Sequence, residues 1–293
     1  MALSKFLDPK NDYAFKRIFG TEKNKDILVH FLNDMLGFNE GEKIQRVSFL
    51  KPNQDPDIAS KKQSIVDVLC TDEKGTQYIV EMQVVRTASF VKRAQYYAAK
   101  AYVSQMNSGE AYQNLKQIIF LAITDFVMFP DKKEYKSDHV ILDKNSHTQD
   151  LKDFSFCFLE LPKFTKTIDE LKTLIEKWAY FFKHASHTAE DEMEKIIGLD
   201  IVIRQAYEAL NQFSWSEEEL RIYEREKKSQ LDAQAMFLDA EQRGVAKGKA
   251  EGRAAGRAEG IKEVAKKMLA QGINIQTIIM TTGLSKEEIE SLD

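Results

Sequence analysis

Two apolar segments separated by a short turn constrain the fold of this chain more than any other feature. Residues 63–71 and 77–85 are rich in Val, Ile, Leu and Tyr, and the turn between them, residues 72–75, ends in Gly75. Branched and aromatic residues favour strands, and a short connection that contains glycine favours a tight reversal of the chain. The two segments are therefore predicted to be neighbouring strands of a β-hairpin.

Three polar residues, Asp67, Glu81 and Gln83, are set into these apolar segments. Side chains alternate between the faces of a strand, so Glu81 and Gln83 should share one face while Val80 and Met82 occupy the other. A carboxylate in a buried strand costs several kcal/mol unless it is compensated. Two carboxylates on adjacent strands also repel each other, and a divalent metal ion is the usual remedy. The alternative interpretation is a solvated face on an edge hairpin.

Periodicity and turn residues predict the elements around the hairpin. Asp8 is expected to cap the first helix, with Pro9 at its first position and Gly20 at its end. The loop over residues 51–57 contains two prolines, so regular strand pairing is not expected there. The predicted helices are 8–20, 22–36, 89–107, 167–184, 189–210 and 216–237, and the other predicted strands are 43–50, 117–126, 139–142 and 154–161. The order is helix, strand, strand, strand, helix, strand, followed by further strands and helices.

These features together resemble a known superfamily. An Asp followed by Glu-x-Gln resembles the PD-(D/E)XK nuclease core, with Val66 in place of the Pro and Gln83 in place of the Lys. The segment 11–20, NDYAFKRIFG, closely resembles the opening of the recombination-promoting nuclease (Rpn) and transposase family of that superfamily. The resemblance implies an α/β (α+β) fold with an αβββαβ core, in which helices flank a mixed sheet.

The resemblance also implies a metal site. Asp67, Glu81 and the backbone carbonyl of Met82 would bind Mg²⁺, with Mn²⁺ or Ca²⁺ as alternatives. Gln83 would orient the attacking water or the phosphate, but it supplies no positive charge, so another cation must do so. Arg93 on the following helix is the catalytic candidate nearest in sequence, together with its neighbour Lys92, and Lys16 in the N-terminal signature is a further candidate. Alternatively, Lys92 is solvated and Arg93 pairs with a carboxylate.

Other residues near these motifs have two interpretations each. Asp12 and Glu22 would add a carboxylate from the first helices, or they are charges favoured at helix starts by the helix dipole. Tyr96, Tyr97 and Tyr102 are interpreted as core residues in preference to platforms for stacking nucleic-acid bases.

The tail contains a glycine at every fourth position, at Gly244, Gly248, Gly252, Gly256 and Gly260. Each glycine costs a helix about 1 kcal/mol relative to Ala. Residues 243–267 carry eight Lys and Arg against three Glu. Three interpretations stay open: a semi-flexible helical linker, a helix that another backbone approaches closely in a homo-oligomer, and a segment that contacts phosphates.

The end of the chain is predicted to form three short helices that break at Gly272 and Gly283, with a capping box from Ser285 to Glu288. The shape suggests a helix-turn-helix, but the last helix carries several acidic residues and one Lys, which suits a DNA groove poorly. We interpret it as a packing or oligomerisation module. The glycine repeat and the TGLS ending are similar to the tails of the Rpn family.

Charge and cysteine content limit the partners and the compartment. The net charge of −4 argues against general affinity for nucleic acid, so a DNA contact must use a local basic surface. Cys70 and Cys157 lie in apolar segments and are expected to be buried thiols, and no cysteine pattern suggests secretion. No long apolar segment predicts a signal peptide or a membrane span, so a cytoplasmic location is expected.

Three regions are expected: a nuclease-like domain over residues 1–165, a helical extension over 166–240, and a glycine-repeat helical tail over 241–293. The resemblance implies a metal-dependent DNA endonuclease associated with DNA recombination or mobile elements. The alternative is a catalytically weakened, nuclease-like fold that acts as a DNA- or protein-binding module. Gln83 in place of Lys favours the second hypothesis, whereas the retained Asp67 and Glu81 favour the first.

Overall fold

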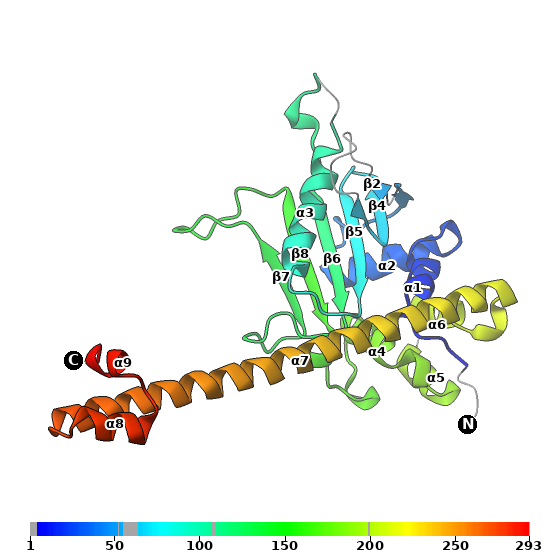
Figure 1. Ribbon diagram of the computed structural model, residues 1–293. Helices are drawn as coiled ribbons and strands as arrows, with labels where there is room; N and C mark the ends of the chain where they lie inside the picture. Colours follow the sequence, from blue (N-terminus) through cyan, green and yellow to red (C-terminus); the bar gives the residue numbers. More distant parts are fainter. Residues whose placement is uncertain (1–4, 52, 55–63, 107–108, 199, 293) are drawn as a thin grey trace. The chain divides into compact units, whose positions relative to one another are not determined.

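The computed structural model describes residues 5–51, 53–54, 64–106, 109–198 and 200–292 (Figure 1). The chain divides into two compact units, residues 1–231 and residues 232–293. Within the described ranges, every helix is too short or too polar to cross a membrane. The expected division into three regions stays a proposal.

A six-stranded mixed sheet forms the centre of the first unit. Its strands lie in the order β1-β4-β5-β6-β8-β7. β4 and β5 form the predicted hairpin, with Val68 opposite Val80 and with Gly75 at a φ of +90° in the turn. β5, β6 and β8 are parallel, and β7 pairs antiparallel with β8. The bounds are β1 (Val47–Phe49), β4 (Val68–Asp72), β5 (Gln77–Gln83), β6 (Ile118–Thr124), β7 (Lys136–Val140) and β8 (Phe154–Glu160).

The predicted order of helices and strands is confirmed. α1 (Asp12–Phe19) and α2 (Lys25–Leu36) precede β1, and α3 (Phe90–Val103) connects the parallel strands β5 and β6. A short 3₁₀ turn, η1 (Glu22–Asn24), occupies the start that was predicted for the second helix. The predicted end of the α3 helix at residue 107 lies outside the described residues.

The predicted first strand of the hairpin is divided into two strands, and part of the predicted loop before it forms a strand, contrary to the prediction. β2 (Asn53–Gln54) and β3 (Ser64–Ile65) form a separate antiparallel pair, and Asp67 lies in the bend between β3 and β4. The pairing is compatible with the neighbouring prolines because Asn53 and Gln54 keep their own N–H groups. Five residues of the predicted loop and strand lie outside the described residues: Pro52, Asp55, Pro56, Asp57 and Gln63.

The capping residue of α1 also differs from the prediction. Asn11 caps α1 and accepts hydrogen bonds from the backbone N–H groups of Tyr13 and Ala14. Asp8 instead accepts from the N–H of Lys10 in a turn before the helix. Both residue types suit an N-cap, and starting the helix at Asp12 places its apolar side chains in the core.

Apolar side chains fill both faces of the sheet. α3 covers one face, where Phe90, Ala94 and Ala98 pack against Ile79 and other strand residues (Figure 1). The larger core on the other face contains the apolar side chains of α1, α2 and the later helices, including the aromatic residues Phe15, Phe19, Phe31, Trp178 and Phe182. Cys70 and Cys157 are buried free thiols, as predicted.

The helical part after the sheet is more broken than predicted. α4 (Leu174–His184) begins after a capping box at Thr173, later than the predicted start at residue 167. Gly198, with a φ of +56°, separates α5 (Glu190–Ile197) from α6 (Ile201–Ala209), where one helix was predicted. A positive φ suits glycine and ends a right-handed helix.

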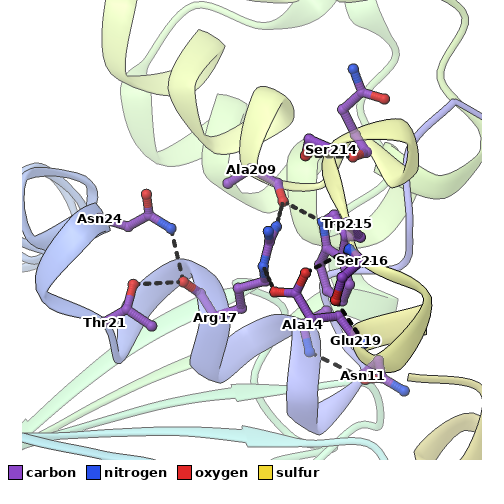
Figure 2. A network of polar contacts seen from close by, with 11 residues as sticks. Asn11, Ala14, Arg17, Thr21, Asn24, Ala209, Ser214, Trp215, Ser216 and Glu219 are labelled. Atoms are coloured by element: carbon purple, nitrogen blue, oxygen red, sulfur yellow. Dashed lines mark hydrogen bonds and ion pairs between the residues drawn. The ribbon is translucent and has the colours of Figure 1, made fainter. Parts of the chain in front are cut away.

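Arg17 anchors α1 to the later helices of this unit. Its Nε donates to Glu219 at 2.9 Å, another guanidinium nitrogen donates to the carbonyl of Ala209 at 2.9 Å, and its Cζ lies 4.2 Å from the centre of the Trp215 ring (Figure 2). Glu219 also completes the predicted capping box with Ser216 at the start of α7 (Glu217–Ala270). The direction of α1 is therefore set by partners that lie far away in the sequence.

The second unit contains most of α7 and two short helices, α8 (Ile275–Thr282) and α9 (Lys286–Glu290). α7 continues without a break through the five glycines to Ala270, whereas the sequence predicted a helix that ends near residue 237, followed by a separate helical tail. The breaks at Gly272 and Gly283 are confirmed, and both have positive φ. The buried side chains of Ala265, Ile278 and Ile289 form a small core.

Candidate active site

The three polar residues of the hairpin lie together at the carboxyl end of β5. The N–H of Asp67 donates to Glu81 Oε1 at 3.3 Å, and the N–H of Met82 donates to Asp67 Oδ2 at 2.9 Å. Gln83 Nε2 donates to Glu81 Oε2 at 2.8 Å. The strand period places Glu81 and Gln83 on the α3 side of the sheet, and Asp67 meets them because the chain bends just before β4.

The two carboxyl groups lie where ionisation is costly. Glu81 is 3% exposed, and the side chain of Asp67 is 14% exposed. Burial, together with the neighbouring charge of Asp12, raises the pKa of Asp67 to about 6. Burial and the charge of Asp67 raise the pKa of Glu81 well above its ordinary value. A bound cation would remove much of this cost.

Two of the three candidate cations contact this group. Arg93 of α3 donates from its guanidinium to Gln83 Oε1, and its Cζ lies 4.9 Å from the centre of the Phe90 ring. Lys16 of α1 lies with Nζ 3.5 Å from Asp67 Oδ1 and 2.8 Å from Asp12 Oδ1. Lys92 is exposed on the surface of α3.

Lys16 also faces a cavity. A cavity of about 720 Å³ lies beside α1, and Lys16, Tyr13 and Lys23 contribute to its lining. The ammonium group of Lys16 thus has the carboxylates on one side, while its side chain remains 39% exposed. Among the described residues that line this cavity, Lys16 is the one that contacts the carboxyl group of Asp67.

Asp12 and Glu22, whose roles the sequence left open, differ in their position. Asp12 lies at the site, since it pairs with Lys16 and its charge acts on Asp67. Glu22 is 72% exposed and pairs with Lys25. Helix periodicity explains the position of Asp12, because Asp12 and Lys16 lie one turn apart on the same side of α1.

One tyrosine lies nearer the site than the sequence suggested. Burial raises the pKa of Tyr97, and the charges of Arg93, Glu81 and Asp67 also act on it. The signal that could have placed it there is its i,i+4 spacing from Arg93 on one helix. The other two tyrosines lie elsewhere: Tyr96 is 45% exposed, and Tyr102 donates a hydrogen bond to Asp153.

The donor groups suit a hard divalent cation. Within the described ranges, His, Cys, Asp and Glu side chains form no metal-binding group of three or more members. The Met82 N–H donates to Asp67. In an extended strand the N–H and C=O of one residue point to the same side, so the Met82 carbonyl is expected on the side of Asp67. All three donors are oxygens, which Mg²⁺ and Ca²⁺ prefer, and the raised pKa values show that positive charge would be favourable here.

Two models of known protein families match this chain, one over most of its length and one at its C-terminal end. Residues 9–240 match the PD-(D/E)XK nuclease family transposases, and residues 258–293 match the C-terminal HTH domain of the Rpn/YhgA-like nuclease family. No curated protein and no solved structure matches the chain. The first match covers most of the sequence and includes α1, the hairpin and α3. The chain therefore belongs to the Rpn-type PD-(D/E)XK nuclease family transposases.

Proposed function

We propose that the protein is a metal-dependent DNA endonuclease that hydrolyses phosphodiester bonds and acts in DNA recombination or on mobile elements. The observation that carries this proposal is the meeting of two carboxyl groups with raised pKa, Asp67 and Glu81, beside two cationic side chains, Lys16 and Arg93. The family match supports the nuclease class. A cytoplasmic location stays a prediction.

Asp67, Glu81 and the Met82 carbonyl are the proposed metal ligands, with Mg²⁺ as the expected ion and Mn²⁺ or Ca²⁺ as alternatives. Such an ion, when bound, stabilises negative charge on a phosphate oxygen and lowers the pKa of a coordinated water. The chain itself keeps the ligands in position, because the Asp67 N–H holds Glu81 and the Met82 N–H holds Asp67.

Gln83 is the proposed positioning group for water or phosphate. An amide nitrogen carries two hydrogens, and one of them donates to Glu81 at 2.8 Å. The amide oxygen accepts from Arg93. These two bonds fix the plane of the amide, so its second N–H has a defined direction in which to donate to a substrate oxygen.

Lys16 is the proposed replacement for the missing motif Lys. Its ammonium has three N–H donors and lies between Asp12 and Asp67, and its side chain remains 39% exposed. Arg93 is more constrained, because it packs on Phe90 and donates to Gln83. We therefore assign Lys16 to the negative charge that develops on the phosphate, and Arg93 to holding Gln83 and balancing Glu81.

Cleavage of supercoiled plasmid DNA in Mg²⁺ tests this function. Asp67→Asn and Glu81→Gln should each abolish cleavage while the circular dichroism spectrum is unchanged, and EDTA should abolish cleavage by the wild type. Asp143→Asn is the matched control, since Asp143 is an exposed carboxylate in a loop. Cleavage at the wild-type rate by either site variant contradicts the assigned roles.

The second candidate function is a catalytically weakened module that binds DNA or protein through the same fold. The observation that favours it is Gln83, whose neutral amide stands where the motif has a charged Lys. Titration calorimetry with Mg²⁺ tests whether the protein binds the metal at all. If the wild type binds Mg²⁺ with a heat that Asp67→Asn lacks, but cleaves no plasmid, single-stranded or branched DNA, the result would favour the module.

A further inference from the structure

The charged side chains of α7 between residues 241 and 259 are sorted onto different faces of the helix. An α-helix turns about 100° per residue, so five cations fall within an arc of about 160°. Of the glutamates in the same stretch, Glu241 and Glu259 fall on the opposite side, and Glu251 lies just outside the arc, beside Lys247. The five cations, named here the basic face, are Arg243, Lys247, Lys249, Arg253 and Arg257.

Alanines lie between the cations, and most of the repeated glycines lie on another side of the helix. By the same angular count, Ala246, Ala250 and Ala254 lie among the cations. Four of the repeated glycines, Gly244 to Gly256, fall outside this arc. The basic face is therefore a shallow surface of methyl groups from which five long cationic side chains extend. The glycine repeat and the charge pattern are separate features of one helix.

The basic face is exposed, and carboxylates neutralise it only weakly. All five cations are exposed. Arg243 pairs with Asp239 at 2.6 Å, and Lys247 approaches Glu251 at 3.8 Å, both as surface i,i+4 pairs. Among the described residues, no carboxylate oxygen lies within 4.0 Å of Lys249, Arg253 or Arg257. Exposed ion pairs are weak and are easily exchanged for a phosphate.

We propose that the basic face binds the phosphate backbone of double-stranded DNA without reading its sequence. The cations extend along about 21 Å of helix axis, and contacts from Lys and Arg to phosphates supply most non-specific affinity for DNA. This inference rests on the proposed nuclease function and adds a second contact with the substrate. It places positive charge on a protein whose net charge is −4.

Two alternatives on the same unit fit less well. A helix that lies on a membrane needs a large apolar face, whereas residues 243–257 contain only alanines and Val245 as apolar side chains. The last helix of the HTH region, α9, carries Glu287, Glu288 and Glu290 against Lys286, so phosphates would repel it. The basic face thus matches the charge of DNA better than α9 does.

Fluorescence anisotropy with a labelled 30-base-pair duplex tests the proposal on the full chain in EDTA, between 50 and 200 mM KCl. One variant converts the basic face to Gln, which keeps helix propensity high. A control variant removes the same charge from the first unit, through Lys→Gln at five exposed lysines: Lys133, Lys144, Lys152, Lys172 and Lys195. Helix content by circular dichroism confirms that both variants fold.

The basic-face variant should bind at least about tenfold more weakly at 50 mM KCl, and its plot of log K against log salt should be less steep by about 4 to 5. The control should stay within about 1 of the wild-type slope. An unchanged slope in the basic-face variant overturns the proposal. The proposal is also overturned if this variant loses the binding of the wild type to phosphatidylserine vesicles but binds DNA as the wild type does. Binding in EDTA is measured without cleavage, so failure of the nuclease function would appear only in the plasmid assay with Mg²⁺.

Discussion

Replacing Asp67 by Asn should stabilise the metal-free protein at pH 8. The pKa of Asp67 is raised from 3.8 to about 6, chiefly by burial and then by the charge of Asp12, which corresponds to about 3 kcal/mol against the ionised carboxylate. Asn keeps an oxygen that can accept the 2.9 Å bond from Met82. It loses the 3.5 Å ion pair with Lys16, but the effect of Lys16 is already included in the raised pKa of Asp67. The free energy of unfolding should therefore rise by about 3 kcal/mol.

The pH dependence follows from linkage between protonation and folding. The folded protein holds the Asp67 proton more tightly than the unfolded chain does, so the contribution of this group is most favourable below pH 3.8 and is lost as the pH rises through about 6. The advantage of Asn over Asp should thus be small near pH 4, grow between pH 4 and 6, and stay constant above about pH 7.

Urea unfolding in EDTA, followed by circular dichroism at pH 4.5 and pH 8, measures this difference. Asp143→Asn is a control of opposite sign, because hydrogen bonds from Ser146 and Asn145 lower the pKa of Asp143. Adding Mg²⁺ should stabilise the wild type, by the linkage between binding and folding, and should leave Asp67→Asn unchanged. If Asp67→Asn is less stable than the wild type at pH 8 in EDTA, then Lys16 and Met82 stabilise the carboxylate more than burial penalises it, and the reasoning is refuted.

Three further predictions concern the groups around the carboxylates. Gln83→Ala should slow single-turnover cleavage about 30- to 1000-fold with little change in Mg²⁺ affinity, and Gln83→Lys should be better tolerated; equal rates for Ala and wild type would make Gln83 a bystander. Lys16→Met should lower the single-turnover rate at saturating Mg²⁺ by at least about tenfold, since a charge near the phosphate is lost. Lys92→Met, on the exposed side of α3, is the control and should match the wild type. Similar losses in both variants would remove the special role of Lys16. Arg17→Met should lower the free energy of unfolding by about 2 to 3 kcal/mol, because two hydrogen bonds and a contact with an aromatic ring disappear; urea unfolding with no change in midpoint would show that α1 does not depend on this anchor.

The sequence by itself determined the hairpin and which side chains share its face. Alternation along 77–85 placed Glu81 and Gln83 on one side, and β5 confirms this, since Gln83 reaches Glu81 and α3 from that side. Gly75 marked the turn, and it has the positive φ that the turn requires. These features depend on neighbours along the chain, so a local pattern is sufficient to predict them.

Boundaries between elements were less well determined. Asp8 and Asn11 are both good capping residues, and only the packing of α1 against the core selects Asn11. The long α7 is a similar case. Its glycines predicted a weak helix, but the residues between them favour helix, and no proline or opposing cap interrupts the segment before Ala270.

Only the tertiary structure determined which cationic side chains lie beside the carboxylates. Lys92 and Arg93 are neighbours in sequence, yet Arg93 contacts Gln83 while Lys92 faces outward. Lys16 comes from a different helix, and it reaches Asp67 because Arg17 ties α1 to Ala209 and Glu219. Propensity and periodicity act over a few residues, whereas the distance between groups on separate elements is set by how those elements pack, and no local pattern encodes that distance.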